Sequence, residues 1–150
     1  MMNKILQTSN AWYLILVRLM TGLVFLSEGI QKFLFADALG VGRFIKIGIP
    51  YPEFFAPFVG FVEIAAGILL VFGLLTRVAA FLLLIDISVA IISTKIPMLH
   101  TSFWTFAHEA RTDFCMLAGT LILLFSGGGK WSADKRLTKH DRGDNAANKT

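Results

Sequence analysis

Long apolar stretches constrain the fold of this chain more than any other feature of its sequence. Four of them, at about residues 11–34, 54–75, 78–96 and 107–125, approach the roughly 20 residues that an α-helix needs to cross a bilayer. Only 16% of the residues are charged, whereas a soluble domain carries about 25%, so a water-facing surface cannot be covered. The sequence therefore predicts an all-α fold, an integral membrane four-helix bundle that occupies residues 11–129.

Residues that mark helix ends and membrane interfaces flank these stretches. The first stretch begins with Trp12 and Tyr13, which are residue types that gather at membrane–water interfaces. We expect Pro97 to end the third stretch and the glycine run 127–129 to end the fourth. The connector at about residues 36–53 mixes isoleucines with basic residues. It therefore either lies along the membrane interface or folds as an irregular apolar loop over the bundle.

Basic residues are distributed unequally between the two ends of the predicted bundle. Four spans place both termini on one side, where residues 1–10 and Arg77 contribute one basic residue each and residues 130–150 contribute six, a total of eight. The basic residues of the opposite end are Arg43, Lys46, Lys95 and, at the edge of the fourth span, Arg111. Because basic loops stay on the cytoplasmic side, the sequence predicts a multi-pass protein of the bacterial cytoplasmic (inner) membrane with both termini cytoplasmic.

The C-terminal tail, residues 130–150, is basic, and we expect it to be flexible. A short basic segment beside a span is attracted to anionic membrane lipids. No aromatic-interleaved basic patch or base-reading motif accompanies it, which argues against a nucleic-acid partner. The single cysteine, Cys115, cannot form a disulfide within the chain, and we interpret it as a packing residue.

Glycines recur at helical spacing on one face of each of the first two predicted spans. They are Gly22 and Gly29 in the first span and Gly60 and Gly67 in the second. Glycines allow two helix backbones to approach closely inside a membrane, so we expect these two faces to pack together. Lys32 and Glu63 lie on the same faces, and the packing would bring their side chains within reach of each other.

Ionisable side chains inside the spans are the candidate functional residues. Each costs at least ~2.5 kcal/mol at the centre of a bilayer and therefore usually faces the interior of the bundle. At about 1.5 Å per residue, Arg18 and Asp86 lie roughly 10 and 13 Å from the cytoplasmic ends of their helices. We expect them to form an ion pair, with a structural role or a functional one.

A second group of ionisable residues lies in the outer half of the predicted bundle. Its members are Glu28, Lys32, Glu63, Glu109 and Asp113. Glu28 precedes Lys32 by four residues and can pair with it. Such a group can bind a cation, pass a proton or hold a polar headgroup, or it can be a static pairing that fixes the helices. No histidine or cysteine spacing typical of a metal site accompanies the group, and no metal is predicted.

A set of short motifs follows the length of the chain. It consists of Arg18-Leu-Met-Thr-Gly22, Gly29, Lys32, Ile49-Pro50 with Pro52, Glu63, Gly67, Gly73-Leu-Leu-Thr-Arg77 and Gly129-Lys-Trp-Ser-Ala-Asp134. In this order, over about residues 15–136, the set resembles the signature of the DoxX family. The resemblance implies a four-helix membrane bundle. It also implies kinship with DoxD, the quinone-reducing membrane component of thiosulfate:quinone oxidoreductase.

Two functions of different classes remain open on the sequence. In the first, the chain is a redox-associated membrane subunit that binds a quinone in the outer polar group, with Lys32 donating a hydrogen bond and Glu63 relaying a proton. No motif for an intrinsic cofactor is present, so a partner such as a soluble redox protein would supply the electrons, and whether the chain is itself an enzyme stays open. In the second, it is a non-catalytic scaffold or a carrier of small lipophilic molecules. Membrane lipids and a second copy of the chain are further candidate partners.

Overall fold

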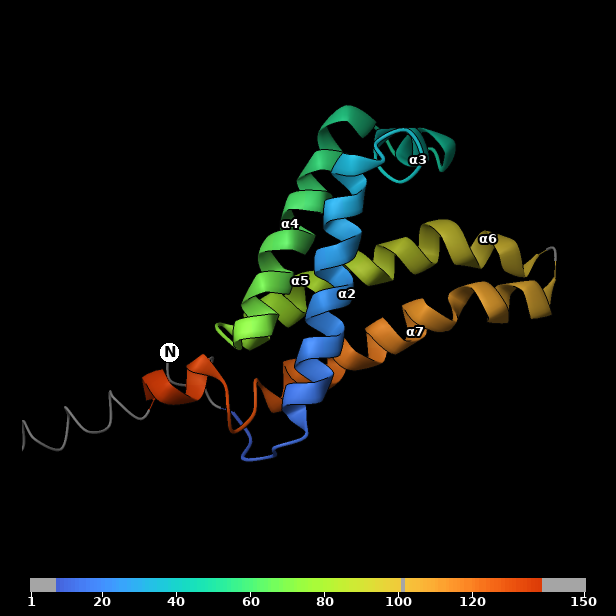
Figure 1. Ribbon diagram of the computed structural model, residues 1–150. Helices are drawn as coiled ribbons and strands as arrows, with labels where there is room; N and C mark the ends of the chain where they lie inside the picture. The colour runs from blue at the N-terminus through green and yellow to red at the C-terminus, as the bar shows by residue number, and fades with distance from the viewer. Residues whose placement is uncertain (1–7, 101, 139–150) are drawn as a thin grey trace, which may run out of the picture.

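A computed structural model describes residues 8–100 and 102–138, and every regular element within them is helical (Figure 1). The elements are α2 (Leu14–Leu34), α3 (Val41–Lys46), α4 (Pro52–Phe72), α5 (Thr76–Ala90), the π-helical segment η1 (Ile91–Lys95), α6 (Ile96–Leu99) and α7 (Phe103–Ser126). Residues 133–138 form a further short helix. The predicted cytoplasmic N-terminal segment lies outside the described residues up to residue 7, and the predicted flexible tail lies outside them from residue 139.

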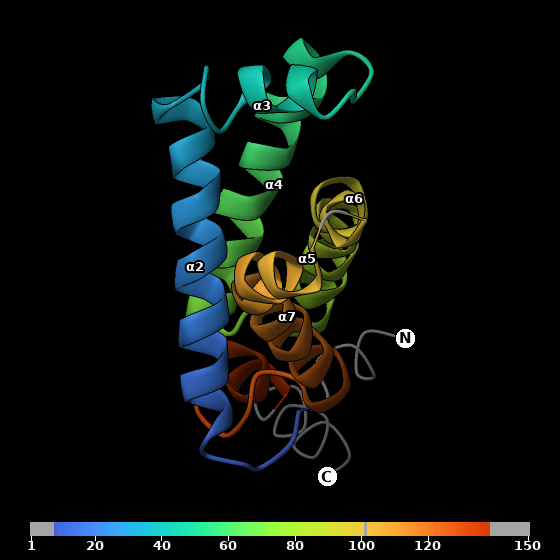
Figure 2. The same ribbon diagram turned by 90° about the vertical axis from the view of Figure 1, so that its right-hand side faces the viewer.

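Two helical hairpins build the fold. In the first, α2 and α4 lie antiparallel and side by side (Figure 1; Figure 2). In the second, α5, η1 and α6 form one nearly continuous helix that packs antiparallel to α7. The hairpins cross near the start of α5 and diverge toward the other end, where α3 packs against α4 (Figure 1).

Three helical segments are long and apolar enough to cross a membrane: Leu14–Leu34, Pro52–Phe72 and Thr76–Leu99. The fourth long helix, α7, has 24 residues and pairs with the third segment, but its first half carries the ionisable residues noted in the sequence. Large apolar side chains such as Phe61 remain exposed, as a lipid-facing surface requires. The prediction of an all-α, integral membrane fold is confirmed.

The helix that begins at Thr76 continues past Pro97. It runs through η1 and α6 to Leu99, so the predicted end of this span at residue 96 is three residues too early. Proline usually breaks a helix because it lacks an N–H and clashes with the preceding turn. Pro97 instead occupies the first turn of α6, directly after the wider π-helical turn, where the regular α-helical bonding is already interrupted.

Glycines set the close approach of α2 to α4. A Cβ atom on Gly29 would lie 2.7 Å from the carbonyl oxygen of Gly60, and one on Gly67 would lie 2.9 Å from the carbonyl oxygen of Gly22. Neither distance leaves room for a carbon atom, because protein interiors are already close-packed. The four glycines therefore lie at the contact between the two helices, and a larger residue at Gly29 or Gly67 would push them apart.

A carboxylate from the C-terminal segment closes the turn between α4 and α5. The chain leaves α4 through Gly73, which has φ of 68°, a conformation that favours glycine. Asp134 then accepts hydrogen bonds from the backbone N–H groups of Leu75 at 2.7 Å and Thr76 at 2.9 Å. Because a helix begins with unpaired N–H groups and a positive dipole end, this carboxylate caps and stabilises α5.

Arg18 of α2 binds the same C-terminal segment. Its guanidinium donates hydrogen bonds to the carbonyl oxygens of Gly128 at 3.0 Å and Trp131 at 3.5 Å, and the charge of Asp134 lies close enough to interact with it. The predicted ion pair with Asp86 is therefore wrong, since Arg18 forms no ion pair with any described residue. Two loop carbonyl groups accept hydrogen bonds from the buried guanidinium, and helical spacing gives no sign of them.

Both ends of the described chain lie at one end of the bundle. The N–H of Gly129 donates to the Thr8 hydroxyl at 2.6 Å, and the N–H of Ser9 donates to the carbonyl oxygen of Ser126 at 2.9 Å. This arrangement agrees with an even number of spans. That this end faces the cytoplasm stays a prediction.

Candidate functional site

A cavity of about 770 Å³ lies between the two hairpins where they diverge. Residues of α2 and α4 form one wall, residues of α5, η1 and α7 form the other, and α3 lies at its end. Most of the lining is apolar and includes Phe25, Phe55, Phe58 and Met116. The ionisable residues that line it are Glu28, Lys32, Arg43, Glu63, Asp86, Lys95, Glu109 and Asp113. The structure thus brings the whole predicted outer group to one cavity.

Lys32 and Glu63 form an ion pair on the α2–α4 wall. The Lys32 ammonium lies 2.6 Å from Glu63 Oε2 and donates a hydrogen bond to Oε1 at 2.8 Å. The two side chains are only 14% and 5% exposed, so the charges are withdrawn from solvent. The contact between Gly29 and Gly60, one turn from Lys32 and Glu63 on their respective helices, brings the two backbones close enough for this pair. A buried pair of this kind is costly to break, because removing one partner leaves the other charge unpaired.

Asp86 of α5 faces the Lys32–Glu63 pair from the other hairpin. Its carboxyl group lines the same cavity and lies close enough to interact electrostatically with Glu63 and Lys32. Residue counts from the helix ends predicted that Asp86 lies at the depth of Arg18. Those counts failed because α5 is inclined to α2 (Figure 1), so equal counts along the two helices do not mean equal depth.

Glu28 lies at the exposed rim of this polar cluster. It lines the cavity, and its charge is close enough to act on Asp86. The predicted pairing of Glu28 with Lys32 does not occur in the described part of the chain, where the Lys32 ammonium binds Glu63 instead. Three carboxyl groups therefore surround one ammonium group on this side of the cavity.

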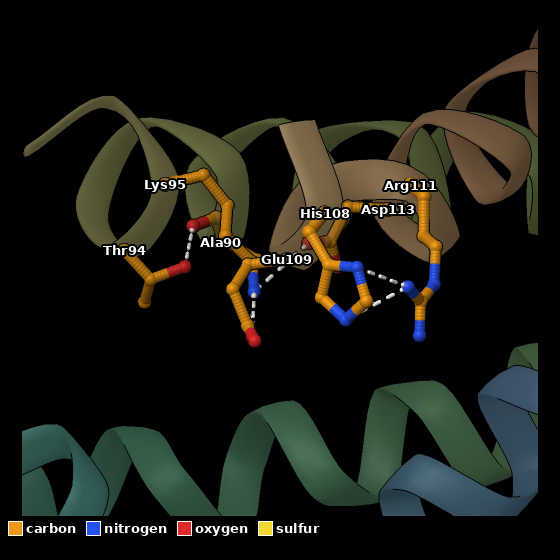
Figure 3. A network of polar contacts seen from close by, with 7 residues as sticks. All are labelled: Ala90, Thr94, Lys95, His108, Glu109, Arg111 and Asp113. Carbon is orange, nitrogen blue, oxygen red and sulfur yellow. Dashed lines mark hydrogen bonds and ion pairs between the residues drawn. The ribbon is translucent and has the colours of Figure 1, made fainter. Parts of the chain in front are cut away.

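A second polar cluster lies on the α5–α7 wall (Figure 3). Lys95 of η1 lies 3.4 Å from Asp113 and 3.9 Å from Glu109, both of α7. Hydroxyl groups of the π-helical turn donate hydrogen bonds backwards along the helix, as Thr94 does to the carbonyl oxygen of Ala90 at 2.6 Å. π-helical turns are frequent at functional sites. Here the turn carries the lysine that joins the two helices.

The remaining polar residues at the start of α7 lie beside this second cluster. Arg111 and His108 contact each other on the exposed side of the helix, with the guanidinium 2.8 Å from the imidazole Nδ1 (Figure 3). In residues 8–100 and 102–138, no three histidine, cysteine, aspartate or glutamate side chains gather in a way that could hold a metal ion.

The chemistry of the cavity combines an apolar volume with a few oriented polar groups. Ligand sites commonly measure about 300–1,000 Å³ and have this composition. Glu63 Oε2 and Asp113 Oδ2 are buried and lie within ion-pair distance of a lysine, yet neither accepts a well-directed hydrogen bond. A bound molecule can donate a hydrogen bond to either oxygen or accept one from the Lys32 ammonium.

Sequence reasoning missed three members of this site. Asp86 was assigned to the wrong layer, while Lys95 and Arg43 were counted only among the basic residues at the outer end of the bundle. The available signal for Lys95 was its place at the end of an apolar span that already carried Asp86. A helix that continues past Pro97 places Lys95 before its last turn, beside the start of α7. No comparable signal marks Arg43, because the fold of the connector decides where α3 lies.

Comparisons with known proteins agree with the membrane fold. The sequence profile of the DoxX family matches residues 13–96. An uncharacterized membrane protein of Mycobacterium tuberculosis is 52% identical over 143 residues, which cover 91% of this chain and 88% of that protein. A Bacillus subtilis protein named "putative oxidoreductase CatD" is 27% identical over 133 residues, covering 89% of this chain and 92% of its own.

An uncharacterized protein of Haemophilus influenzae is 26% identical over 134 residues, which cover 89% of this chain and 97% of that protein. No solved structure matches the chain. The profile match spans α2 to η1, which include the glycine contact, the Lys32–Glu63 pair and Asp86. Together with the relative that is 52% identical over nearly the full length, this match shows that the chain belongs to the DoxX family of membrane proteins.

Proposed function

We propose that this chain is a redox-associated subunit of the bacterial inner membrane that binds a quinone, or a similar lipophilic molecule, in the cavity between the two hairpins. The observation that carries the proposal is the buried Lys32–Glu63–Asp86 cluster at the wall of an otherwise apolar cavity of about 770 Å³. The printed name of the Bacillus subtilis relative, an oxidoreductase, supports a redox role at the level of analogy.

The lining of the cavity fits a quinone headgroup. A quinone is a flat apolar ring with two carbonyl oxygens, so it needs apolar walls and hydrogen-bond donors. Phe25, Phe55 and Phe58 supply aromatic and apolar surface. The Lys32 ammonium has three N–H donors and lies at the cavity wall, so it can donate to a carbonyl oxygen while it remains paired with Glu63.

The two carboxyl groups supply a path for a proton. A bound quinone supplies the chemistry of a two-electron acceptor that also takes up two protons. A proton carried by Glu63 or Asp86 can pass to an oxygen held by Lys32, and Glu28 at the rim can replace that proton from solvent. The electrons would come from a partner, such as a soluble redox protein.

Quinone binding tests the proposal directly. Lipid nanodiscs that contain the purified protein would be titrated with decylubiquinone, and Kd would be measured for wild type, Lys32→Met and Glu53→Gln. Loss of a charged hydrogen bond costs about 1.5–3 kcal/mol, so we expect Lys32→Met to bind about 10- to 100-fold more weakly. Glu53 is an exposed residue in the first turn of α4, and its variant should bind like wild type.

The outcomes separate the two classes of function. Weaker binding of Lys32→Met alone supports the quinone site. Equal binding by all three proteins, or no binding by wild type, overturns it and leaves a scaffold or a carrier of other molecules. Mass spectrometry of lipids and cofactors retained by the protein from native membranes would then identify what the cavity carries.

A further inference from the structure

We propose that a phosphate group, from an anionic phospholipid or from free phosphate, binds in a second cavity beside the first. This cavity measures about 580 Å³ and lies between α3 on one side and η1 and α6 on the other. Its charged lining consists of Arg43, Lys46, Lys95 and Glu109. We call it the vestibule, and the proposal does not depend on quinone binding.

Three of the four basic residues predicted for this end of the bundle line the vestibule. Arg43 and Lys46 come from the connector between α2 and α4, and Lys95 comes from the end of the third span. They are about fifty residues apart along the chain, yet their side chains line one cavity. Three positive charges face one carboxylate there, and the Glu109 side chain is 50% exposed, so the vestibule carries net positive charge.

Two of these cations have no protein partner in the part of the chain that the structure describes. Lys95 is paired with Asp113 and Glu109, whereas neither Arg43 nor Lys46 forms an ion pair or a side-chain hydrogen bond with another described residue. A guanidinium fork binds two phosphate oxygens at once, and an ammonium binds phosphate as a point charge. The vestibule therefore presents unpaired donors of the kinds that recognise phosphate.

The position of α3 favours a lipid as the source of the phosphate. Phe44 of α3 is buried against the bundle, whereas Ile45 is 61% exposed, as in a short helix that lies along a membrane interface. Ile92 and Ile96, which flank the vestibule residues of η1, are 61% and 45% exposed. A phospholipid whose phosphate lies in the vestibule can lay its acyl chains along these isoleucines.

The vestibule also adjoins the larger cavity. Arg43, Ile47, Lys95 and Glu109 line both. The Lys32–Glu63–Asp86 cluster lines the larger cavity. A lipid headgroup held between α3 and η1 would therefore cover one end of that cavity. In that position it would limit the access of water to the cavity and leave the side between the hairpins open to lipophilic molecules.

Lipid retention tests the proposal in the intact chain. The protein would be placed in nanodiscs of equal parts phosphatidylglycerol and phosphatidylcholine, and native mass spectrometry would count the lipids of each kind that stay bound. The test variant is the double substitution Arg43→Gln and Lys46→Gln. The matched control is Lys130→Gln with Arg136→Gln, which removes one lysine and one arginine from exposed positions at the other end of the bundle.

We expect wild type and the control to retain phosphatidylglycerol in preference to phosphatidylcholine. In the vestibule variant, the ratio of retained phosphatidylglycerol to retained phosphatidylcholine should fall about tenfold. A second arm uses nanodiscs of phosphatidylcholine alone with millimolar inorganic phosphate. If phosphate raises Tm for wild type and the control but not for the vestibule variant, while no lipid preference exists, the site binds free phosphate. Equal behaviour of the vestibule variant and the control in both arms overturns the proposal.

Discussion

At the scale of single residues, the Lys32–Glu63–Asp86 cluster brings one ammonium group and two carboxyl groups together at the cavity wall. Lys32 and Glu63 come from the two helices of one hairpin, and Asp86 comes from the other hairpin. The cluster therefore depends on the packing of both hairpins.

The substitution Glu63→Gln tests whether this cluster moves protons. Glutamine keeps the shape and a hydrogen-bond acceptor for Lys32 but cannot exchange a proton. We expect normal membrane insertion together with loss of any quinone-linked activity of native membranes that contain the protein, measured as quinone-dependent electron transfer. Glu53→Gln on the same helix should keep the activity. If Glu63→Gln keeps full activity, Glu63 only joins the two helices and does not relay a proton.

Arg18 serves the opposite end of the bundle, and a double-mutant cycle can verify its surroundings. Removing the guanidinium in Arg18→Met leaves buried carbonyl groups unpaired, which should cost about 1–3 kcal/mol in the free energy of unfolding. We expect its effect to add to that of Asp86→Asn within about 0.5 kcal/mol, because the two side chains share no partner. With Asp134→Asn the effects should couple, since those charges lie close together. Unfolding in mixed detergent micelles gives the energies.

A coupling energy between Arg18 and Asp86 larger than that between Arg18 and Asp134 would contradict the structure. It would instead favour the direct ion pair that the helical spacing suggested.

At the scale of the elements, the contact between α2 and α4 positions the functional cluster. Gly29 of α2 and Gly60 of α4 are in close contact, and Lys32 and Glu63 follow them by about one turn on their respective helices. The same two helices carry the apolar wall of the cavity. A change in their separation should therefore alter both the stability of the hairpin and the geometry of the site.

Gly29→Ala measures the tightness of this contact. The added methyl group would meet the Gly60 carbonyl oxygen at 2.7 Å, so the helices must shift, and overpacking of this kind costs about 1–3 kcal/mol. Thermal unfolding in detergent should show a lower Tm than for wild type. Leu23→Ala, at a residue of the same helix that is 53% exposed, should change Tm little. Equal Tm values for Gly29→Ala and wild type would show that the contact is looser than described.

At the scale of the whole molecule, both ends of the described chain lie at the end of the bundle that holds Arg18 and Asp134. α3 and the vestibule lie at the other end. The charged site therefore opens toward one face of the membrane, and the chain termini lie toward the other. The unequal distribution of basic residues predicts that orientation.

Cysteine labelling establishes the orientation. In a Cys115→Ser background, Asn10→Cys and Arg136→Cys should react with a membrane-impermeant maleimide only when the cytoplasmic face is accessible, as in inverted vesicles. His100→Cys should react in intact cells. All three positions are exposed. Labelling of Asn10→Cys and Arg136→Cys from opposite sides would contradict the four-span fold, and the reverse orientation of all three would contradict the positive-inside prediction.

The sequence alone determined the membrane class, the four long helices and the glycine faces of the first hairpin. These follow from properties that act locally, because apolar length decides which segments cross a bilayer and helical spacing decides which residues share a face. Lys32 and Glu63 could be matched for the same reason. Each lies on a glycine face, and two such faces can pack together closely only in a narrow range of geometries.

The tertiary structure alone decided the partners of Arg18, Asp86 and Lys95. The second hairpin is inclined to the first, and this brings Asp86 close to Glu63. The spacing of residues within one helix does not determine the angle between two hairpins. The carbonyl groups that bind Arg18 belong to a loop more than a hundred residues away in the chain. The continuation of the helix past Pro97 depends on a π-helical turn, whose hydrogen bonds compete closely with the ordinary α-helical ones and form where packing favours them.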